Sequence, residues 1–169
     1  MKIRVKIELF GTGSKARLYA IRLPEQTKPE VARFIDRILA GDYDQKSKRV
    51  RDALRTILDW LDRIARLDGA QERFFRPREG RGLALPIDKG PLRLYCYRLD
   101  DGNLLLCGGG LKQSQTIQTS PDCLPHFDIM NSVVSELKRQ QVTAAQLPDS
   151  IDQPLHLEIT LPTDYDFAR

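Results

Sequence analysis

The sequence predicts an α+β fold, in which an antiparallel sheet is packed by helices. Residues 2–9 alternate strictly between charged and apolar side chains, which is typical of a half-buried strand. Residues 92–107 contain two β-rich runs around Asp-Asp-Gly, a strong hairpin signal. Two stretches between these regions carry apolar residues at helical spacing. We therefore expect an N-terminal hairpin and a three-strand meander, packed by two long helices and a C-terminal helix.

The strands of this sheet are bounded by turn-forming residues. Gly-Thr-Gly-Ser separates the first two strands, and Asp-Lys-Gly-Pro precedes the hairpin in the second half of the chain. Short connections between the three sequential strands favour a meander. The predicted strands cover residues 2–9, 15–23, 82–87, 92–99, 103–107 and 155–161.

Three helices are predicted from apolar stripes and end signals. A capping-box pattern with a proline near the helix start predicts a first helix over residues 27–41, ending at a glycine. A longer helix is expected from about residue 45 to 68, again stopped by a glycine. The third covers residues 124–140.

Composition indicates one domain covering residues 1–169, with an acidic C-terminal tail. The chain has 41% hydrophobic and 30% charged residues, enough for a globular core. Its net charge of +4 is uneven, because residues 1–112 hold 24 Lys/Arg against 15 Asp/Glu and the remainder is acidic. A basic surface of this kind suits an anionic partner, above all nucleic acid.

Several classes of site and location are not expected. Three cysteines without zinc-ligand spacing and two histidines away from acid clusters predict neither a metal nor a cofactor. His126 at the start of the third helix could be a general acid, but we interpret it as a partly exposed polar residue. His156 lies on the polar side of the last strand and is interpreted as a surface residue. No apolar run reaches the length of a membrane span, and the N-terminus alternates where a signal peptide would be continuously apolar, so a cytoplasmic protein without membrane contact is expected.

The strand over residues 92–99 carries the first candidate site residues. Alternation places Arg93, Tyr95 and Tyr97 on one face. This face could hold a phosphate and stack a base, or it could consist of half-buried tyrosines beside an arginine paired with an acid. From the residues alone the second interpretation is favoured, because tyrosine is simply a good strand former.

Two further basic features adjoin this hairpin. Gly108-Gly109-Gly110 is expected to form a flexible turn that presents Lys112 at a strand end. Upstream, residues 71–81 form the densest arginine run of the chain. Arg76 and Arg78 in this run could hold phosphates, since arginine matches phosphate oxygens well, or could point to water from a segment docked through its phenylalanines.

The run LRLYCYRLDDGNLLLCGGGLKQSQT (residues 92–116) resembles the core of the RelE/ParE toxin superfamily, particularly its HigB-like and phage-derived members. These proteins have an arginine-aromatic strand, a short turn, an apolar strand ending in glycine, and a lysine followed by small polar residues. The resemblance covers roughly residues 74–121. It implies the toxin half of a type II toxin-antitoxin pair, a small α+β endoribonuclease that cuts mRNA, commonly on the ribosome.

The resemblance also implies roles for individual residues. Arg93 would contact the scissile phosphate and Lys112 would stabilise the transition state or the leaving group, without a metal. Tyr95 or Tyr97 would stack a base, and the two arginines upstream would hold flanking phosphates. The partners implied are mRNA and a cognate antitoxin.

This chain also departs from the family pattern. Many relatives place a tyrosine or histidine just beyond the lysine, where this sequence has Gln-Ser-Gln-Thr-Ile, so no general base is identified. The terminal segments also make the chain larger than a minimal toxin of this kind. The alternative is therefore a non-catalytic module of the same fold, which docks an antitoxin or a protein target such as DNA gyrase.

Overall fold

A computed structural model describes residues 1–41, 47–75, 83–84, 91–112, 121–165 and 167. Strands and helices follow one another in separate runs along the described chain, as is typical of an α+β protein, so the predicted fold class is confirmed. Among these residues, no helix combines the length and the apolar character needed to cross a membrane. The elements are β1 (Lys2–Thr12), β2 (Arg17–Arg22), α1 (Glu30–Leu39), α2 (Ser47–Arg63), β3 (Leu83–Ala84), β4 (Leu92–Asp100), β5 (Asn103–Leu111), α3 (Leu124–Arg139) and β6 (Leu155–Thr160).

The described strands form one sheet in the order β3-β4-β5-β2-β1-β6. The predicted N-terminal hairpin and the β3-β4-β5 meander are both present as antiparallel pairs. The sheet is nevertheless mixed, because β2 and β5 pair in parallel. This pairing was not predicted, and it arises because α1 and α2 carry the chain across the sheet before the meander folds back beside β2.

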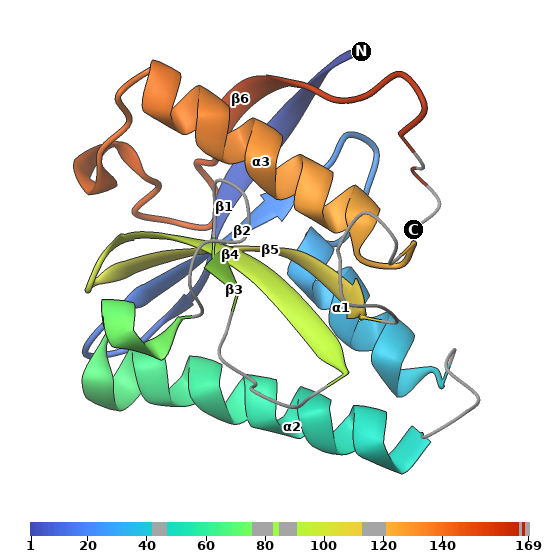
Figure 1. Ribbon diagram of the computed structural model, residues 1–169. Helices are drawn as coiled ribbons and strands as arrows, with labels where there is room; N and C mark the ends of the chain where they lie inside the picture. Colours follow the sequence, from blue (N-terminus) through green and yellow to red (C-terminus); the bar gives the residue numbers. More distant parts are fainter. Residues whose placement is uncertain (42–46, 76–82, 85–90, 113–120, 166, 168–169) are drawn as a thin grey trace.

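Helices cover both faces of this sheet. Figure 1 shows α3 on one face and α1 and α2 on the other. Alternate residues of β4 enter the two cores: Leu94 and Cys96 pack toward α1 and α2, whereas Tyr95 and Tyr97 pack toward α3. The predicted division of β4 into two faces is therefore confirmed, and both faces are covered by helices.

The glycine run in β5 is part of a strand, so the predicted flexible turn is wrong. A side chain at Gly109 would place its Cβ 2.0 Å from the carbonyl oxygen of Arg93, and one at Gly110 would lie 2.4 Å from that of Asp122. The glycines therefore allow neighbouring backbones to approach closely. This approach lets β5 continue to Leu111, so Lys112 follows a fixed strand end.

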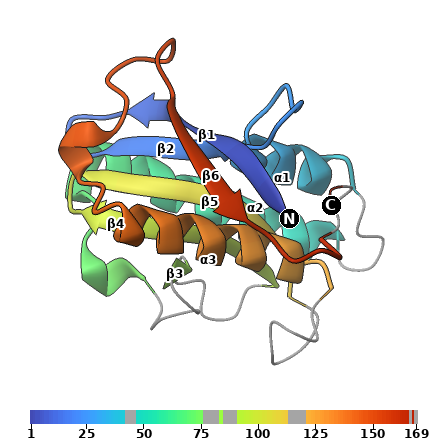
Figure 2. The ribbon, with the colours of Figure 1, turned by 90° about the horizontal axis from the view of Figure 1, so that it is seen from above.

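The β1-β6 end of the sheet is less covered than its centre. On the side of the sheet packed by α1 and α2, α1 contacts β5 and β2 and α2 contacts β4, while the polar side chains of β1 and β6 are exposed. The amino group of Met1 donates to the carbonyl of Leu161 at 3.0 Å. Figure 2 accordingly shows the N-terminus beside the end of β6.

Candidate functional site

The first candidate site lies where β5 ends and α3 begins, and we call it the β5-end site: Arg93, Lys112, Asp122 and Cys123. Arg93 lies on β4 opposite Gly110 of β5. Its side chain is 6% exposed, and its Nη1 atom donates to the carbonyl of Leu92 at 3.0 Å. Its guanidinium therefore leaves little surface for direct contact with a large substrate.

Lys112 is half-buried at the end of the same sheet. Its backbone N–H donates to the carbonyl of Pro91 at 2.7 Å, which ties the residue after β5 to the residue before β4. Immediately before it, the N–H of Leu111 donates to Oδ2 of Asp122 at 2.6 Å. The backbone that carries Lys112 is therefore held by two hydrogen bonds to different parts of the chain.

The charges of the β5-end site affect the pKa of the Cys123 thiol. Burial raises the pKa of Cys123 to about 11, and the charge of Asp122 adds to this rise. The positive charges of Arg93 and Lys112 both act in the opposite direction on the same pKa. Arg93 pairs with Gly110, two residues before Lys112, so the two cations lie at the same end of the hairpin. The buried carboxylate of Asp122, just before α3, is bonded to the residue between Gly110 and Lys112 and offsets part of their charge.

Of the two tyrosines predicted to stack a base, the structure excludes Tyr95, and stacking on Tyr97 stays a prediction. Tyr95 is fully buried, and its ring packs edge-on against Phe127 of α3 with a centroid distance of 5.8 Å. A base could stack on Tyr95 only if α3 moved away, so this prediction is wrong. Tyr97 is half-buried on the same side, with the ammonium of Lys138 5.9 Å from its ring centroid. Arg76 and Arg78 lie outside the described residues.

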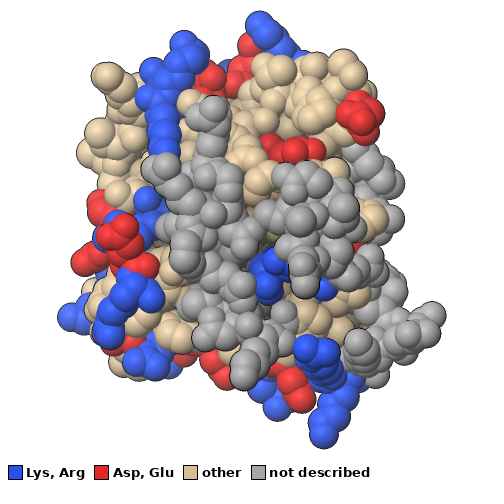
Figure 3. Space-filling model, in the orientation of Figure 1, with Lys and Arg blue, Asp and Glu red and all other residues tan. Residues whose placement is uncertain are grey.

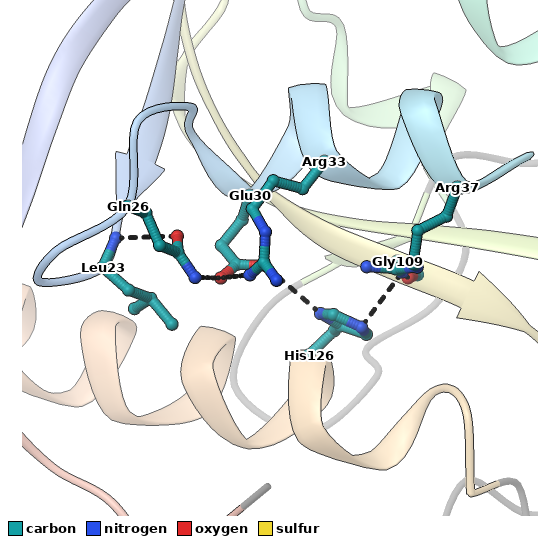
Figure 4. Close-up of polar contacts among 7 residues, drawn as sticks. All are labelled: Leu23, Gln26, Glu30, Arg33, Arg37, Gly109 and His126. Atoms are coloured by element: carbon teal, nitrogen blue, oxygen red, sulfur yellow. Dashed lines mark hydrogen bonds and ion pairs between the residues drawn. The ribbon is translucent and has the colours of Figure 1, made fainter. Parts of the chain in front are cut away.

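A second polar group was not predicted, and we call it the buried polar chain: Gln26, Glu30, Arg33, Arg37 and His126. Figure 4 shows these side chains reaching from the start of α1 to the carbonyl of Gly109 in β5. The predicted surface position of His126 is wrong, because Glu30 and His126 are both 0% exposed. His156, in contrast, is exposed on β6 as expected.

The hydrogen bonds of the buried polar chain indicate which ring nitrogen of His126 carries the proton. Arg37 donates to Gly109 at 2.6 Å, and the same Nη2 atom lies 3.2 Å from Nε2 of His126. A guanidinium has only donors, so Nε2 of the ring accepts. The ring proton is then on Nδ1, which faces Oε2 of Glu30 at 3.6 Å.

Glu30 is held as a carboxylate inside the protein. Burial raises its pKa, but interactions with His126 and the charge of Arg33 outweigh burial and leave the pKa below its ordinary value of 4.5. Arg33 reaches Oε1 at 3.2 Å, and Gln26 donates to the same oxygen at 3.2 Å. A buried ion pair with these added hydrogen bonds is well suited to fixing elements relative to one another.

Gly108 makes room for the buried polar chain. A Cβ at this position would lie 2.5 Å from Nδ1 of His126 and 3.3 Å from Oε2 of Glu30. This glycine inside an apolar strand was the sequence signal that could have revealed the cluster, since it often marks a close approach. Glu30 and His126 are completely buried, so these two side chains position β5 rather than contact a substrate.

Other surface features do not form a stronger site. A hollow of about 560 Å³ beside the start of β1 is lined partly by Lys28 and Arg33, but these cations pair with Asp36 and Glu30. On the face in Figure 3, Lys and Arg side chains are interspersed with Asp and Glu around the margin. Within the described part of the chain, no three His, Cys, Asp or Glu residues are grouped to hold a metal ion.

Comparison with known proteins did not assign the chain to a family. No family model matches it, and neither the curated proteins nor the solved structures gave a match. The function must therefore be argued from the residues and their geometry.

Proposed function

We propose that this protein is a RelE/ParE-like toxin that acts as a metal-independent mRNA endoribonuclease in the cytoplasm and is held in check by a cognate antitoxin. One observation supports this proposal above the others. Arg93 and Lys112 are the residues that the resemblance pairs at the scissile phosphate. Arg93 pairs with Gly110, two residues before Lys112, and the N–H of Lys112 donates to the carbonyl of Pro91, two residues before Arg93. Residues 19 positions apart in the sequence are thus brought together at one end of a β-hairpin.

The reaction needs only the RNA and well-placed charge. The ribose 2′-oxygen forms a bond to the adjacent phosphorus, and the bond from phosphorus to the 5′-oxygen breaks. The 2′-hydroxyl loses its proton, and the leaving 5′-oxygen gains one. Negative charge accumulates on the phosphorane in between, and a nearby cation stabilises it. The products are a 2′,3′-cyclic phosphate and a 5′-hydroxyl end.

The two cations have different roles in this proposal. Lys112 is half-buried and follows the strand end, so its ammonium is the group that contacts the phosphate. Arg93 is 6% exposed and its guanidinium is hydrogen-bonded to the backbone. Its charge therefore makes the local electrostatic potential more positive, but the side chain does not contact the RNA. This role differs from the direct phosphate contact that the resemblance implies, because the guanidinium is buried.

The alternative is a non-catalytic module of the same fold. The burial of Tyr95 favours it, because the predicted contact with a base is removed. Asp122 favours it as well, since a buried carboxylate weakens the attraction for a phosphate. Such a module would bind an antitoxin or a target such as DNA gyrase.

Controlled expression in bacteria separates these functions. The ribonuclease should stop growth and leave mRNA fragments with 5′-hydroxyl ends, and chelating divalent metals should not prevent cleavage by the purified protein. Lys112→Ala should abolish growth arrest and mRNA cleavage. Lys48→Ala removes the same charge from an exposed site on α2 and should abolish neither. Growth arrest with intact mRNA and an induced DNA-damage response would favour the gyrase-binding alternative, and unchanged cleavage by Lys112→Ala would contradict the assigned site.

A further inference from the structure

The strands at the β1-β6 end of the sheet carry an exposed basic surface that the proposed active site does not use. We call it the basic strand face: Lys2, Arg4 and Lys6, which alternate with buried residues along β1 and are all exposed. Their partners across the strand pair are Thr160, Glu158 and His156, also exposed. The face exists because α1 and α2 pack on the neighbouring strands.

The charges of this face are largely available for a ligand. Lys2 lies 3.7 Å from Glu158, but the two side chains are 75% and 65% exposed, and such surface pairs are weak. Within the described part of the chain, Arg4 and Lys6 have no ion-pair partner. Arg22 shares this side of the sheet, but it is bonded to Glu8 at 2.6 Å.

The topology places this face at the same end of the sheet as Lys112. β5 runs parallel to β2, and β2 runs antiparallel to β1. The C-terminal end of β5 and the N-terminal end of β1 are therefore at the same end of the sheet, with β2 between the two strands. The β5-end site is on the side of the sheet that α3 packs and the basic strand face is on the other side, so an RNA that reaches both sites passes around this end of the sheet.

We propose that the basic strand face binds the sugar-phosphate backbone of single-stranded RNA flanking the cleavage site. The choice of RNA rests on the proposed function; the binding surface rests on the geometry of β1. Alternate residues on a strand recur about every 7 Å, so the three cations form a regular row. Cationic rows neutralise successive phosphates and bind without regard to sequence.

The chemistry of the face favours a nucleic acid over a protein partner. Its six exposed side chains include no Phe, Tyr or Trp and no large apolar residue. Protein interfaces are usually anchored by such residues at their centre, whereas phosphate contacts need only charged and polar groups. The acidic Glu158 is the one carboxylate among these six, so it should oppose RNA binding.

The test measures binding of a fluorescent 20-nucleotide RNA by anisotropy at several salt concentrations. The RNA carries 2′-O-methyl groups, so it cannot be cleaved by attack of a 2′-hydroxyl. The triple variant Lys2→Gln, Arg4→Gln, Lys6→Gln should bind about tenfold more weakly at low salt, and the slope of log Kd against log salt should fall by about 2. The matched control changes Lys48, Arg51 and Arg55, exposed cations of α2, to Gln and should bind nearly as the parent does.

A gain-of-binding variant guards against misfolding as an explanation. Glu158→Gln should tighten RNA binding severalfold, a result that damage to the fold would not produce. Equal weakening by the two triple variants, or no effect of the β1 triple variant, would overturn the proposal. A β1 triple variant that no longer binds an acidic protein but still binds RNA like the parent would also overturn the proposal.

Failure here is distinguishable from failure of the proposed function. Lys112-dependent cleavage of unmodified RNA together with unchanged binding by the β1 triple variant would reject the basic strand face and leave the ribonuclease intact. Binding through the face by a protein that does not cleave RNA would support the face and reject the ribonuclease.

Discussion

Arg37 in α1 donates a 2.6 Å hydrogen bond to the carbonyl oxygen of Gly109 in β5. Gly109 lies three residues before Lys112, so this bond ties a helix to the strand end that carries the proposed catalytic cation. The ring of His126 accepts from the same guanidinium nitrogen and thereby adds α3 to the connection. The position of Lys112 thus depends on two helices as well as on its own hairpin.

The bond from Arg37 predicts the behaviour of Arg37→Met. Without the guanidinium, the carbonyl of Gly109 loses a donor and Nε2 of His126 is left without one, so stability should fall by about 1–3 kcal/mol. Hydrogen exchange should accelerate in the peptide covering β5 more than in the rest of the sheet. Lys48→Met, in an exposed part of α2, serves as the control, and equal exchange in both variants would contradict the connection.

Gly108 provides a test of packing. Gly108→Ala should destabilise the protein by about 1–3 kcal/mol, because the new Cβ would overlap the ring of His126. Urea unfolding measures the change. Gly11→Ala is the matched control on β1, where the nearest atom to the new Cβ is 3.9 Å away and little change is expected. Similar losses from both substitutions would show that backbone freedom, rather than the contact with His126, explains the glycine.

Glu30 predicts a loss of stability in acid. Its pKa is lower in the folded protein than its ordinary value of 4.5, because contacts with His126 and Arg33 outweigh the effect of burial. The unfolded chain therefore takes up this proton first as the pH falls. The stabilisation by ionised Glu30 should be present above pH 4.5 and should disappear below it.

Glu30→Gln tests this assignment. The variant should be less stable than the parent at pH 7, by about 1–3 kcal/mol, and the difference should shrink as the pH falls through the acid range. Urea midpoints at a series of pH values measure it. Glu158→Gln removes an exposed carboxylate and should leave the acid profile almost unchanged. A constant difference between Glu30→Gln and the parent at every pH would refute the lowered pKa.

The three cysteines should be unreactive in the folded protein. Cys96, Cys107 and Cys123 are buried thiols, and burial raises the pKa of each, to about 11 for Cys123. The thiolate is the reactive form, so a thiol reagent at pH 7.5 should label none of them until urea is added. A cysteine introduced at the exposed Leu39 should react at once and provides the positive control. Rapid labelling of native Cys123 would show that the β5-end site opens readily.

The sequence determined the local elements because their signals are local. Alternation along β1, the Asp-Gly step of the β4-β5 hairpin and the apolar stripes of the helices need no distant partner. A π-helical turn over Ile64–Asp68 follows α2 directly, so Gly69 was correctly predicted as the end of the second helical segment; it has a φ of 76°, a conformation that glycine adopts without strain. These signals were sufficient for the α+β class and for the meander.

Tertiary structure decided what the sequence pattern left open. Whether Tyr95 faces RNA or a helix depends on where α3 packs, and α3 begins 29 residues later in the chain. The parallel pairing of β2 with β5 depends on the path of two helices, and the burial of His126 depends on a space left by Gly108. Each of these features is set by contacts between distant segments, which a pattern of neighbouring residues does not encode.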